Sequence, residues 1–182
     1  MKSILILGAG MSSSSLIKYL LSQAKEKNWF IKVVDQDIEL VKRKLNKHEC
    51  AEALAFNAID SEERKIRIAK ADLVISMLPA RYHVEVAQDC IDLKVDLITP
   101  SYISKEMQAL DEAARKAGIV IMNEIGVDPG IDHMSAMHVI DGIRAKGGNL
   151  ILFESFTGGL VAPESDNNLW NYKFTWNPRN VV

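Results

Sequence analysis

The sequence lacks an excess of basic residues, a long apolar run near its start and closely spaced cysteines. Its 182 residues include 22 Lys and Arg against 24 Asp and Glu, which gives a formal net charge of −2 at pH 7. A nucleic-acid-binding surface needs cations that neutralise phosphates, and an amphipathic membrane anchor needs a lysine-rich face. The aliphatic run at residues 4–7 is far shorter than the roughly 20 apolar residues that span a bilayer. We therefore expect neither nucleic acid nor a membrane as a partner.

The two cysteines, Cys50 and Cys90, are forty positions apart and form no CxxC pair. This usage is typical of reduced thiols in the core of a cytoplasmic protein. The four histidines make no HExxH pattern, and no serine stands in a GxSxG context. The spacing therefore favours neither a metal site nor a Ser/His/Asp hydrolase.

Short aliphatic runs alternate with amphipathic stretches over the first 125 residues. The runs are continuous in Val, Ile and Leu, as strands are when helices cover both faces of a parallel sheet. Strands are expected at 3–7, 31–35, 53–56, 73–77, 95–99 and 119–122, and helices at 12–27, 38–47, 62–69, 84–93 and 105–117. The alternation predicts an α/β domain with a doubly wound (Rossmann) parallel sheet over residues 1–125.

The pattern changes after residue 125. A helix is expected at 129–145, ended by Gly147 and Gly148, followed by a strand at 150–156. Half of the 12 aromatic residues fall in the last thirty positions, and a surface that exposed them all would favour association. We expect residues 126–182 to be the start of a second α+β domain, for substrate binding or dimerisation, and the chain to be truncated within it.

A glycine-rich turn connects the first expected strand to the first expected helix. It reads Gly8-Ala9-Gly10-Met11-Ser12-Ser13. Gly8 permits a tight turn, and Gly10 lets the backbone approach a pyrophosphate at the helix N-terminus. Ser13 replaces the third glycine of the usual dinucleotide-binding pattern. Alone, the turn also fits an ordinary strand–helix connection with Ser12 as the N-cap.

An acidic residue at the end of the second strand favours the dinucleotide interpretation. Asp35 stands twenty-five positions after Gly10, where a carboxylate accepts hydrogen bonds from the adenine ribose hydroxyls. It would repel a 2′-phosphate, and no arginine follows it directly, so the sequence favours NAD, with NADP as the alternative. Further candidates to line the cofactor crevice follow this strand and later ones: Gln36, Asn57, Ala58, Leu78, Pro79, Pro100 and Ser101.

The segment at 123–133, NEIGVDPGIDH, offers two interpretations of one carboxylate. Asp128 and Pro129 fit the N-cap and N1 positions of the next helix. Asp128 would also lie at the carboxyl edge of the sheet, beside the nicotinamide, where it could orient a cationic amine or iminium and exchange its proton. His133 is a weaker acid–base candidate and fits a packed histidine better.

Several segments together resemble the saccharopine dehydrogenase family, most closely its glutamate-forming type. They are GAGMSSS at 8–14, SMLPARYH at 76–83, TPSYIS at 99–104, NEIGVDPGIDH at 123–133, and the stretch from GGLVAPES to YKFTWNPR at 158–179. The resemblance runs over the whole chain. It implies a nicotinamide-dependent oxidoreductase of lysine metabolism, which interconverts saccharopine with glutamate and 2-aminoadipate 6-semialdehyde through hydride transfer at a C=N bond.

The same resemblance implies a set of site residues. Cofactor contacts would come from Ala9, Gly10, Met11, Ser12, Asp35, Asn57, Ala58, Pro100, Ser101, Val127, Asp128 and Pro129. Ser101, Tyr102 and Asp128 would contact saccharopine, with Asp128 near its secondary amine as the catalytic residue. Catalysis would depend on holding C4 of the nicotinamide against the imine carbon.

Three features depart from the family pattern. Fungal members have a basic residue after the second strand, where this chain has Asp35-Gln36-Asp37. They have a cysteine just before the Gly158-Gly159 pair, where Thr157 stands here, so no role for that thiol transfers. Family chains are more than twice as long and complete a substrate domain. We therefore expect this fragment alone to bind nucleotide without turning over substrate.

Two alternatives stay open. A related amino-acid or polyamine imine reductase would share the scaffold, whereas a nucleotide-sensing module would bind the cofactor without redox chemistry. Ser101, Tyr102 and Asp128 are not needed for nucleotide binding alone, which argues against the sensor. The aromatic residues near the end of the chain suggest a homodimer contact.

Overall fold

The computed structural model describes residues 1–159 and 161–174. These residues belong to two compact units, Met1–His133 and Met134–Val182, which are described separately. Trp176 and most of the segment 172–179 lie outside the described residues.

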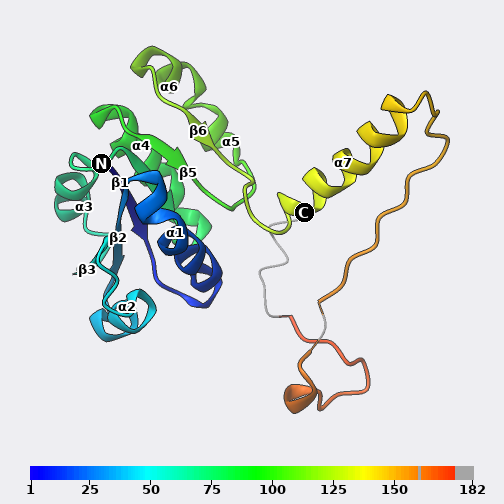
Figure 1. Cartoon of the computed structure of the whole chain (residues 1–182), viewed down its shortest axis with the longest axis horizontal. Helices are drawn as coiled ribbons and strands as arrows, with labels where there is room; N and C mark the ends of the chain where they lie inside the picture. Colours follow the sequence, from blue (N-terminus) through cyan, green and yellow to red (C-terminus); the bar gives the residue numbers. More distant parts are fainter. Residues whose placement is uncertain (160, 175–182) are drawn as a thin grey trace. The chain divides into compact units, whose positions relative to one another are not determined.

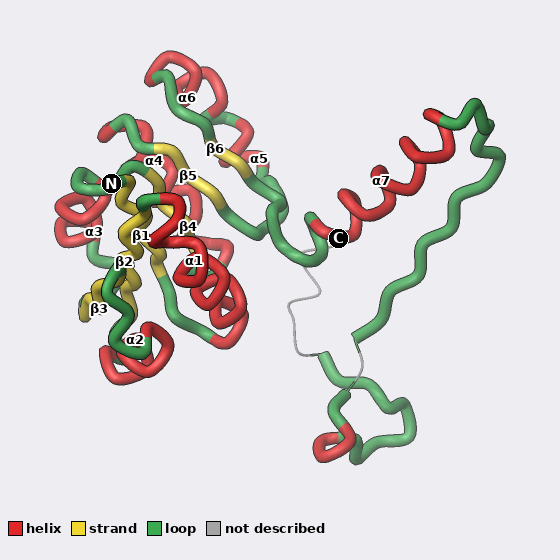
Figure 2. The backbone as a smooth tube through the Cα atoms, in the orientation of Figure 1, coloured by secondary structure: helices red, strands yellow, loops and turns green. Residues whose placement is uncertain are grey.

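Six parallel strands in the first unit form one sheet in the order β3-β2-β1-β4-β5-β6 (Figures 1 and 2). The strands are β1 Lys2–Leu7, β2 Trp29–Asp35, β3 Ala51–Ala55, β4 Leu73–Ser76, β5 Asp96–Ile98 and β6 Ile121–Met122. Strand order reverses between β1 and β4, which is the topological switch point of a doubly wound sheet. The predicted Rossmann fold is confirmed.

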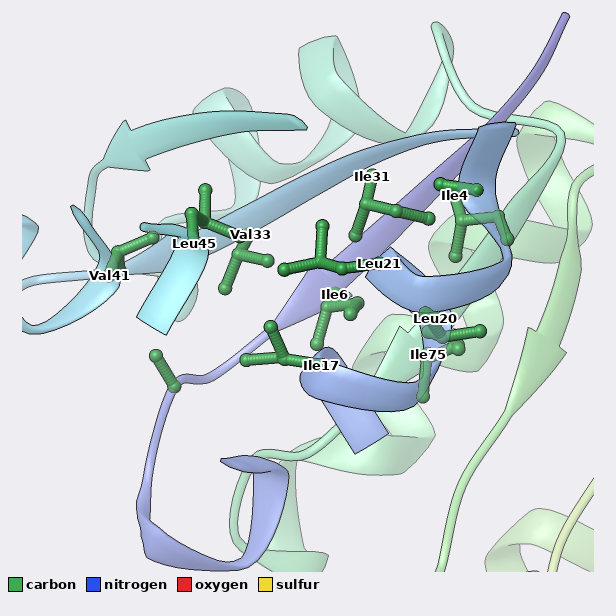
Figure 3. Close-up of a cluster of buried hydrophobic side chains, with 12 residues drawn as sticks. Ile4, Ile6, Ile17, Leu20, Leu21, Ile31, Val33, Val41, Leu45 and Ile75 are labelled. Atoms are coloured by element: carbon green, nitrogen blue, oxygen red, sulfur yellow. The ribbon is translucent and has the colours of Figure 1, made fainter. Parts of the chain in front are cut away.

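Helices cover both faces of this sheet because its side chains alternate between two buried clusters. Ile4 and Ile6 of β1 belong to one cluster with residues of α1 and α2, drawn in Figure 3, whereas Leu5 and Leu7 belong to a second cluster with residues of α3, α4 and α5. The helical segments are η1 Met11–Ser13, α1 Ser14–Lys27, α2 Ile38–Leu45, α3 Ser61–Ile68, η2 Ala80–Tyr82, α4 His83–Leu93, α5 Lys105–Gln108 and α6 Asp111–Ala117. Full burial of each aliphatic side chain contributes about 1.5–3 kcal/mol.

The single helix predicted over 105–117 is wrong, since α5 and α6 are separate. The Leu110 N–H bonds to the Met107 carbonyl three residues back, at 3.1 Å, which interrupts the regular α-helical ladder. Met107 of α5 and Ala114 of α6 are nevertheless both buried, and Met107 belongs to the second core cluster. A tight turn therefore lets two short helices bury apolar side chains where one straight helix was expected.

The helix α7, Ile131–Ala145, begins at the end of the first unit and is followed by Gly147, whose φ of +78° suits a helix end. The predicted helix end is thus confirmed, but the strand predicted at 150–156 is wrong. Residues 149–159 have no regular structure, and Ile151 and Phe156 are 95% and 89% exposed. A strand needs a partner for its backbone hydrogen bonds, and none is present within the described part of the second unit.

The remaining described residues of the second unit contain the short η3, Pro163–Ser165, and an aromatic pair. The rings of Tyr172 and Phe174 meet edge to face at 5.3 Å between centroids. Over the described ranges, no helix has the length and apolar character needed to cross a bilayer. Both Cys50 and Cys90 are free thiols, and burial raises the pKa of Cys90 to about 12.

Candidate functional site

The turn after β1 leaves its backbone open at Gly10. Gly8 has a φ of +101°, and a Cβ there would lie 3.0 Å from the Met77 carbonyl oxygen, so the position requires glycine. A Cβ at Gly10, by contrast, would have nothing within 4 Å. The helical segment begins directly afterwards, at Met11. An anionic group can therefore approach the backbone at Gly10 and the N–H groups that follow it.

Asp35 lies at the carboxyl end of β2 and contacts this turn. Its Oδ2 accepts a hydrogen bond of 2.8 Å from the Ala9 N–H, and its Oδ1 accepts one of 3.1 Å from the Asp37 N–H. Each carboxylate oxygen has two lone pairs, so each can still accept a bond from a ribose hydroxyl. The carboxylate is held in place before any ligand binds.

Lys44, on α2, also contacts the turn, although no pattern in the sequence indicates this. Its Nζ donates to the Gly10 carbonyl at 2.5 Å and to Ser14 Oγ at 2.8 Å. Partial burial lowers the pKa of Lys44, while the charge of Asp35 acts in the opposite direction. A cation beside Gly10 thus offsets part of the negative charge of Asp35.

A cavity of about 270 Å³ opens at the carboxyl ends of the first four strands. It is lined by Gly8, Val34, Asp35, Gln36, Phe56, Asn57, Ala58, Ile59, Leu78, Pro79, Arg81 and Tyr82. Doubly wound sheets bind ligands outside these strand ends, beside the switch point. A larger hollow of about 560 Å³ lies against α6 and β6, but it includes none of the predicted cofactor residues. The smaller cavity is therefore the candidate nucleotide site, because the predicted cofactor residues line it and not the larger hollow.

A buried ion pair supports one wall of this cavity. Arg64 of α3 is 2% exposed, and its Nε donates to Asp89 Oδ2 of α4 at 2.6 Å. The same guanidinium donates from Nη1 to the carbonyls of Ala58, at 3.0 Å, and Ile59, at 3.2 Å. The loop between β3 and α3 is thereby tied to α4, a link that spacing along the chain did not reveal.

A second group of predicted residues meets in the loops after β5 and β6. Tyr102 Oη donates a hydrogen bond of 2.6 Å to Asp128 Oδ1. The Glu124 N–H donates to the Ser101 carbonyl at 3.1 Å, which joins the two loops. A Cβ at Gly126 would lie 2.9 Å from the Pro100 carbonyl oxygen, so glycine permits this close approach. Tyr102 and Asp128, both predicted to contact the substrate, are therefore neighbours in space.

The interpretation of Asp128 and Pro129 as N-cap and N1 is wrong, because α7 begins at Ile131. Residues 126–131 form a closed loop with a cis peptide between Asp128 and Pro129. The Gly126 N–H donates to the Pro129 carbonyl at 2.8 Å, and the Ile131 N–H donates to the Gly126 carbonyl at 3.0 Å. Asp128 consequently faces Tyr102 and does not cap the helix.

Acidic side chains surround His133 and Tyr102. The hydrogen bond with Asp132 raises the pKa of His133, and the charges of Asp128 and Glu124 contribute in the same direction. The hydrogen bond with Asp128 likewise raises the pKa of Tyr102. The His133 side chain is 71% exposed, so the expectation of a packed histidine is wrong. The negative charges of Asp132, Asp128 and Glu124 favour a cationic group in these loops.

Ser101 has a partner in His83, the last residue of the segment at 76–83. Its Oγ lies 2.9 Å from Nε2 of His83, whose Nδ1 lies 2.9 Å from Ser76 Oγ. His83 is 3% exposed, and its burial lowers its pKa to about 4. The imidazole is therefore neutral near pH 7.

The predicted site residues thus divide into two groups. The first surrounds the glycine turn and its cavity: Gly8, Ala9, Gly10, Met11, Ser12, Ser13, Asp35, Gln36, Asn57, Ala58 and Leu78. The second lies in the loops after β5 and β6: Pro100, Ser101, Tyr102, Val127, Asp128 and Pro129. Among the described residues, no cluster of three or more His, Cys, Asp and Glu is arranged to hold a metal ion.

Both parts of the chain match family models. Residues 4–122 match the saccharopine dehydrogenase NADP binding domain, and residues 126–182 match the saccharopine dehydrogenase C-terminal domain. Saccharopine dehydrogenase [NADP(+), L-glutamate-forming] of Pyricularia oryzae is 37% identical over 181 residues, and that of Schizosaccharomyces pombe 39% over 182 residues. These matches cover 100% of this chain and 39% and 40% of those proteins.

A solved structure gives the same result. Apo saccharopine dehydrogenase (L-Glu forming) from Saccharomyces cerevisiae superposes with a TM-score of 0.80 at 35% identity, covering 100% of this chain and 40% of that one. Alpha-aminoadipic semialdehyde synthase of Arabidopsis thaliana is 44% identical over 131 residues, which are 72% of this chain and 12% of that protein. The chain thus spans about 40% of the length of the saccharopine dehydrogenases it matches.

Proposed function

The chain belongs to the saccharopine dehydrogenase family, and we propose that the full-length protein interconverts saccharopine with glutamate and 2-aminoadipate 6-semialdehyde. In the oxidative direction, hydride leaves the carbon beside the secondary amine, and water hydrolyses the resulting imine to the amine of glutamate and the aldehyde. The observation that carries this proposal is the 2.6 Å contact of Tyr102 with Asp128 at the carboxyl edge of a dinucleotide-binding sheet.

The residues of the first group, around the glycine turn and its cavity, are suited to bind a nicotinamide dinucleotide. The open face at Gly10 has space for a pyrophosphate, and Asp35 is held where it can accept bonds from the adenine ribose. The cavity beside them has polar and apolar walls suited to the adenosine end, from Gln36 and Asn57 to Leu78. When bound, the cofactor supplies the nicotinamide ring that accepts the hydride.

For the cofactor we propose NADP. The preference for NAD rested on Asp35 and on the absence of an arginine directly after it, and the comparisons do not support that preference. Arg81 lines the same cavity as Asp35, and Lys44 offsets part of the Asp35 charge. Both cations come from other elements, so neither is adjacent to Asp35 in the sequence. They support binding of a 2′-phosphate despite the carboxylate.

Asp128 would hold the protonated secondary amine of saccharopine and accept its proton. The Tyr102 hydroxyl donates to Asp128 and so orients the carboxylate. Glu124 and Asp132 add negative charge around the same loop, which favours an ammonium group there. Proton exchange by a positioned carboxylate contributes roughly 100- to 10,000-fold to a rate.

The proposal is tested with the full-length protein by following the absorbance of reduced nicotinamide after L-saccharopine is added with NADP. We expect NADPH and glutamate to appear in equal amounts, and the Asp128→Asn variant to bind NADP but to turn over roughly 100-fold more slowly. Reduction with another secondary amine but not with saccharopine would favour a related imine reductase. Binding of NADP without any amine-dependent reduction would favour a nucleotide sensor and overturn the proposal.

We also propose a cytoplasmic homodimer that uses aromatic residues of the second unit. Trp170 and Phe174 are 87% and 70% exposed in the isolated chain, as expected of side chains that another surface covers. Sedimentation of the full-length protein tests this proposal, because a monomer at micromolar concentration would contradict it.

A further inference from the structure

We infer that His83 is a positioning residue that fixes the Ser101 hydroxyl as a hydrogen-bond donor toward a carboxylate of the amino-acid substrate. The inference rests on the proposed function, because the family resemblance places Ser101 among the contacts of saccharopine. Neither the sequence motifs nor the relatives' names assign a role to His83.

The imidazole of His83 connects two strand ends. His83 is the first residue of α4, and Ser76 is the last residue of β4. Nδ1 of the ring lies 2.9 Å from Ser76 Oγ, and Nε2 lies 2.9 Å from Ser101 Oγ in the loop after β5. Ser76 is fully buried, His83 is 3% exposed, and Ser101 is half-buried. The chain of contacts thus leads from the core to the hydroxyl of the half-buried Ser101.

The burial of Ser76 selects the tautomer of His83. A neutral imidazole has one N–H donor and one acceptor nitrogen. In the described part of the chain, the hydrogen-bond partner of Ser76 Oγ is His83 Nδ1. A buried hydroxyl hydrogen without an acceptor costs about 1–3 kcal/mol, so the Ser76 O–H donates to Nδ1. The proton of His83 is then on Nε2, and it is donated to Ser101 Oγ.

This direction determines what Ser101 can offer to a ligand. Because Ser101 Oγ accepts from His83, its own hydrogen points to another acceptor. The backbone of Ser101 is held as well, since the Glu124 N–H donates to its carbonyl at 3.1 Å. The opposite tautomer would take the Ser101 hydrogen and leave only an acceptor for the ligand.

A donor at Ser101 complements the acidic groups near it. Asp128 accepts a hydrogen bond from Tyr102, and Glu124 accepts one from the Ile103 N–H, so both carboxylates contact the loop of Ser101. They provide negative charge for the ammonium of an amino acid, whereas they repel its carboxylate. A carboxylate needs hydrogen-bond donors, and Ser101 precedes Tyr102, the residue bonded to Asp128. The two loops therefore present an acceptor for the amine and a donor for the carboxylate.

The tautomer is tested without substrate. Full-length protein carrying ¹⁵N-histidine is examined by NMR for the long-range couplings of the ring nitrogens, with the His83 signals assigned by their loss in the His83→Asn variant. We expect His83 to carry its proton on Nε2 at pH 7. A proton on Nδ1 would overturn the inference whether or not the protein turns over saccharopine.

Two variants test separately the hydrogen bonds of the two ring nitrogens of His83. Asparagine at position 83 can accept from Ser76 near the Nδ1 position but does not reach Ser101, whereas glutamine places an amide N–H near the Nε2 position. We expect His83→Asn to raise the KM for saccharopine by roughly threefold to tenfold, as loss of one neutral hydrogen bond does. The Kd for NADP should change less than this KM, and His83→Gln should recover most of the lost affinity for saccharopine. Equal KM values for both variants, or a change in cofactor affinity alone, would overturn the inference.

If His83 acts by orienting Ser101, its substitution should change the KM for saccharopine only when the Ser101 hydroxyl is present. In a Ser101→Ala background, His83→Asn should not raise the KM further, whereas a merely structural role of His83 would give additive effects. If the unaltered protein does not oxidise saccharopine, the proposed function fails, and the tautomer measurement still judges the arrangement of Ser76, His83 and Ser101. If His83→Asn does not fold, the His83 signals are assigned by their loss in His83→Gln, so the inference stays testable.

Discussion

The Tyr102 hydroxyl donates a hydrogen bond of 2.6 Å to Oδ1 of Asp128, twenty-six residues later in the sequence. The contact joins the loop after β5 to the loop that precedes α7. A tyrosine hydroxyl in this position fixes the direction of one carboxylate oxygen and leaves the other for a ligand. The relationship shows how two residues with no local motif in common come to lie side by side.

Replacement of Asp128 by asparagine should lower the kcat for saccharopine oxidation by roughly 100-fold, because the amide cannot accept the proton of the secondary amine. Tyr102→Phe keeps the carboxylate and removes only its orienting bond, so a fall of roughly tenfold is expected. Steady-state rates with NADP check both variants, and the Kd for NADP provides the control. Full activity of Asp128→Asn would contradict the role given to this carboxylate.

The sheet could be predicted from the sequence because its signal is local. Aliphatic runs such as residues 3–7 face two cores, and the structure packs Ile4 and Leu5 into different clusters. The strand predicted at 150–156 has a similar pattern, yet Ile151 is 95% exposed in the described chain. An apolar run shows that a surface needs covering, but a strand also needs a neighbouring strand. The pattern contains no information about that neighbour.

The site could be predicted only where one residue or one turn determines it. Gly8 and Asp35 follow directly from the strand–turn–helix pattern, whereas the contact of Lys44 with Gly10 depends on how α2 packs beside α1. Arg81 and Asp35 meet in one cavity although forty-six positions separate them. Preference for NAD was inferred from the residues adjacent to Asp35, and charges that arrive from other elements could not enter that inference.

The two glycines of the turn should respond differently to alanine. Gly8→Ala forces a side chain onto a φ of +101° and within 3.0 Å of the Met77 carbonyl, so it should lower the free energy of unfolding by about 1–3 kcal/mol. Gly10→Ala meets nothing within 4 Å and should leave stability unchanged while weakening NADP binding. Denaturant unfolding and cofactor titration of the full-length variants distinguish the two effects. Unchanged NADP affinity in Gly10→Ala would mean that phosphate does not approach this backbone.

Loss of one partner of the buried Arg64–Asp89 pair should lower stability more than replacement of both partners by apolar residues. Arg64→Met leaves the buried Asp89 with Lys65, whose Nζ lies 3.6 Å from Oδ1, as its remaining ion-pair partner, which should cost about 3 kcal/mol of stability. Arg64→Met combined with Asp89→Leu removes both charges and should recover much of that loss. NADP affinity should stay reduced in the double variant, because the carbonyls of Ala58 and Ile59 have still lost their donor. Denaturation curves and cofactor titration of the three proteins measure both quantities.

Stability should decrease in mild acid through His83. Burial lowers its pKa from 6.5 to about 4, so between these values the unfolded chain binds a proton that the folded protein does not. The free energy of unfolding therefore falls as the pH drops from 6.5 toward 4, by up to about 3 kcal/mol for this group. Comparison with His83→Asn isolates the contribution, because other titrating groups are common to both proteins. Parallel pH profiles for the two proteins would show that His83 does not contribute.

Arg81 should decide between the two cofactors. Arg81→Gln removes a cation from the cavity that contains Asp35, so the KM for NADP should rise by roughly tenfold while the KM for NAD changes little. Arg115→Gln serves as the matched control, because it removes the same charge from an exposed position beside the larger hollow at α6. Equal changes for NADP and NAD in Arg81→Gln would mean that the guanidinium contacts the adenine or a shared phosphate. A loss of NADP affinity in Arg115→Gln instead would move the cofactor to the larger hollow, which the glycine turn and Asp35 argue against.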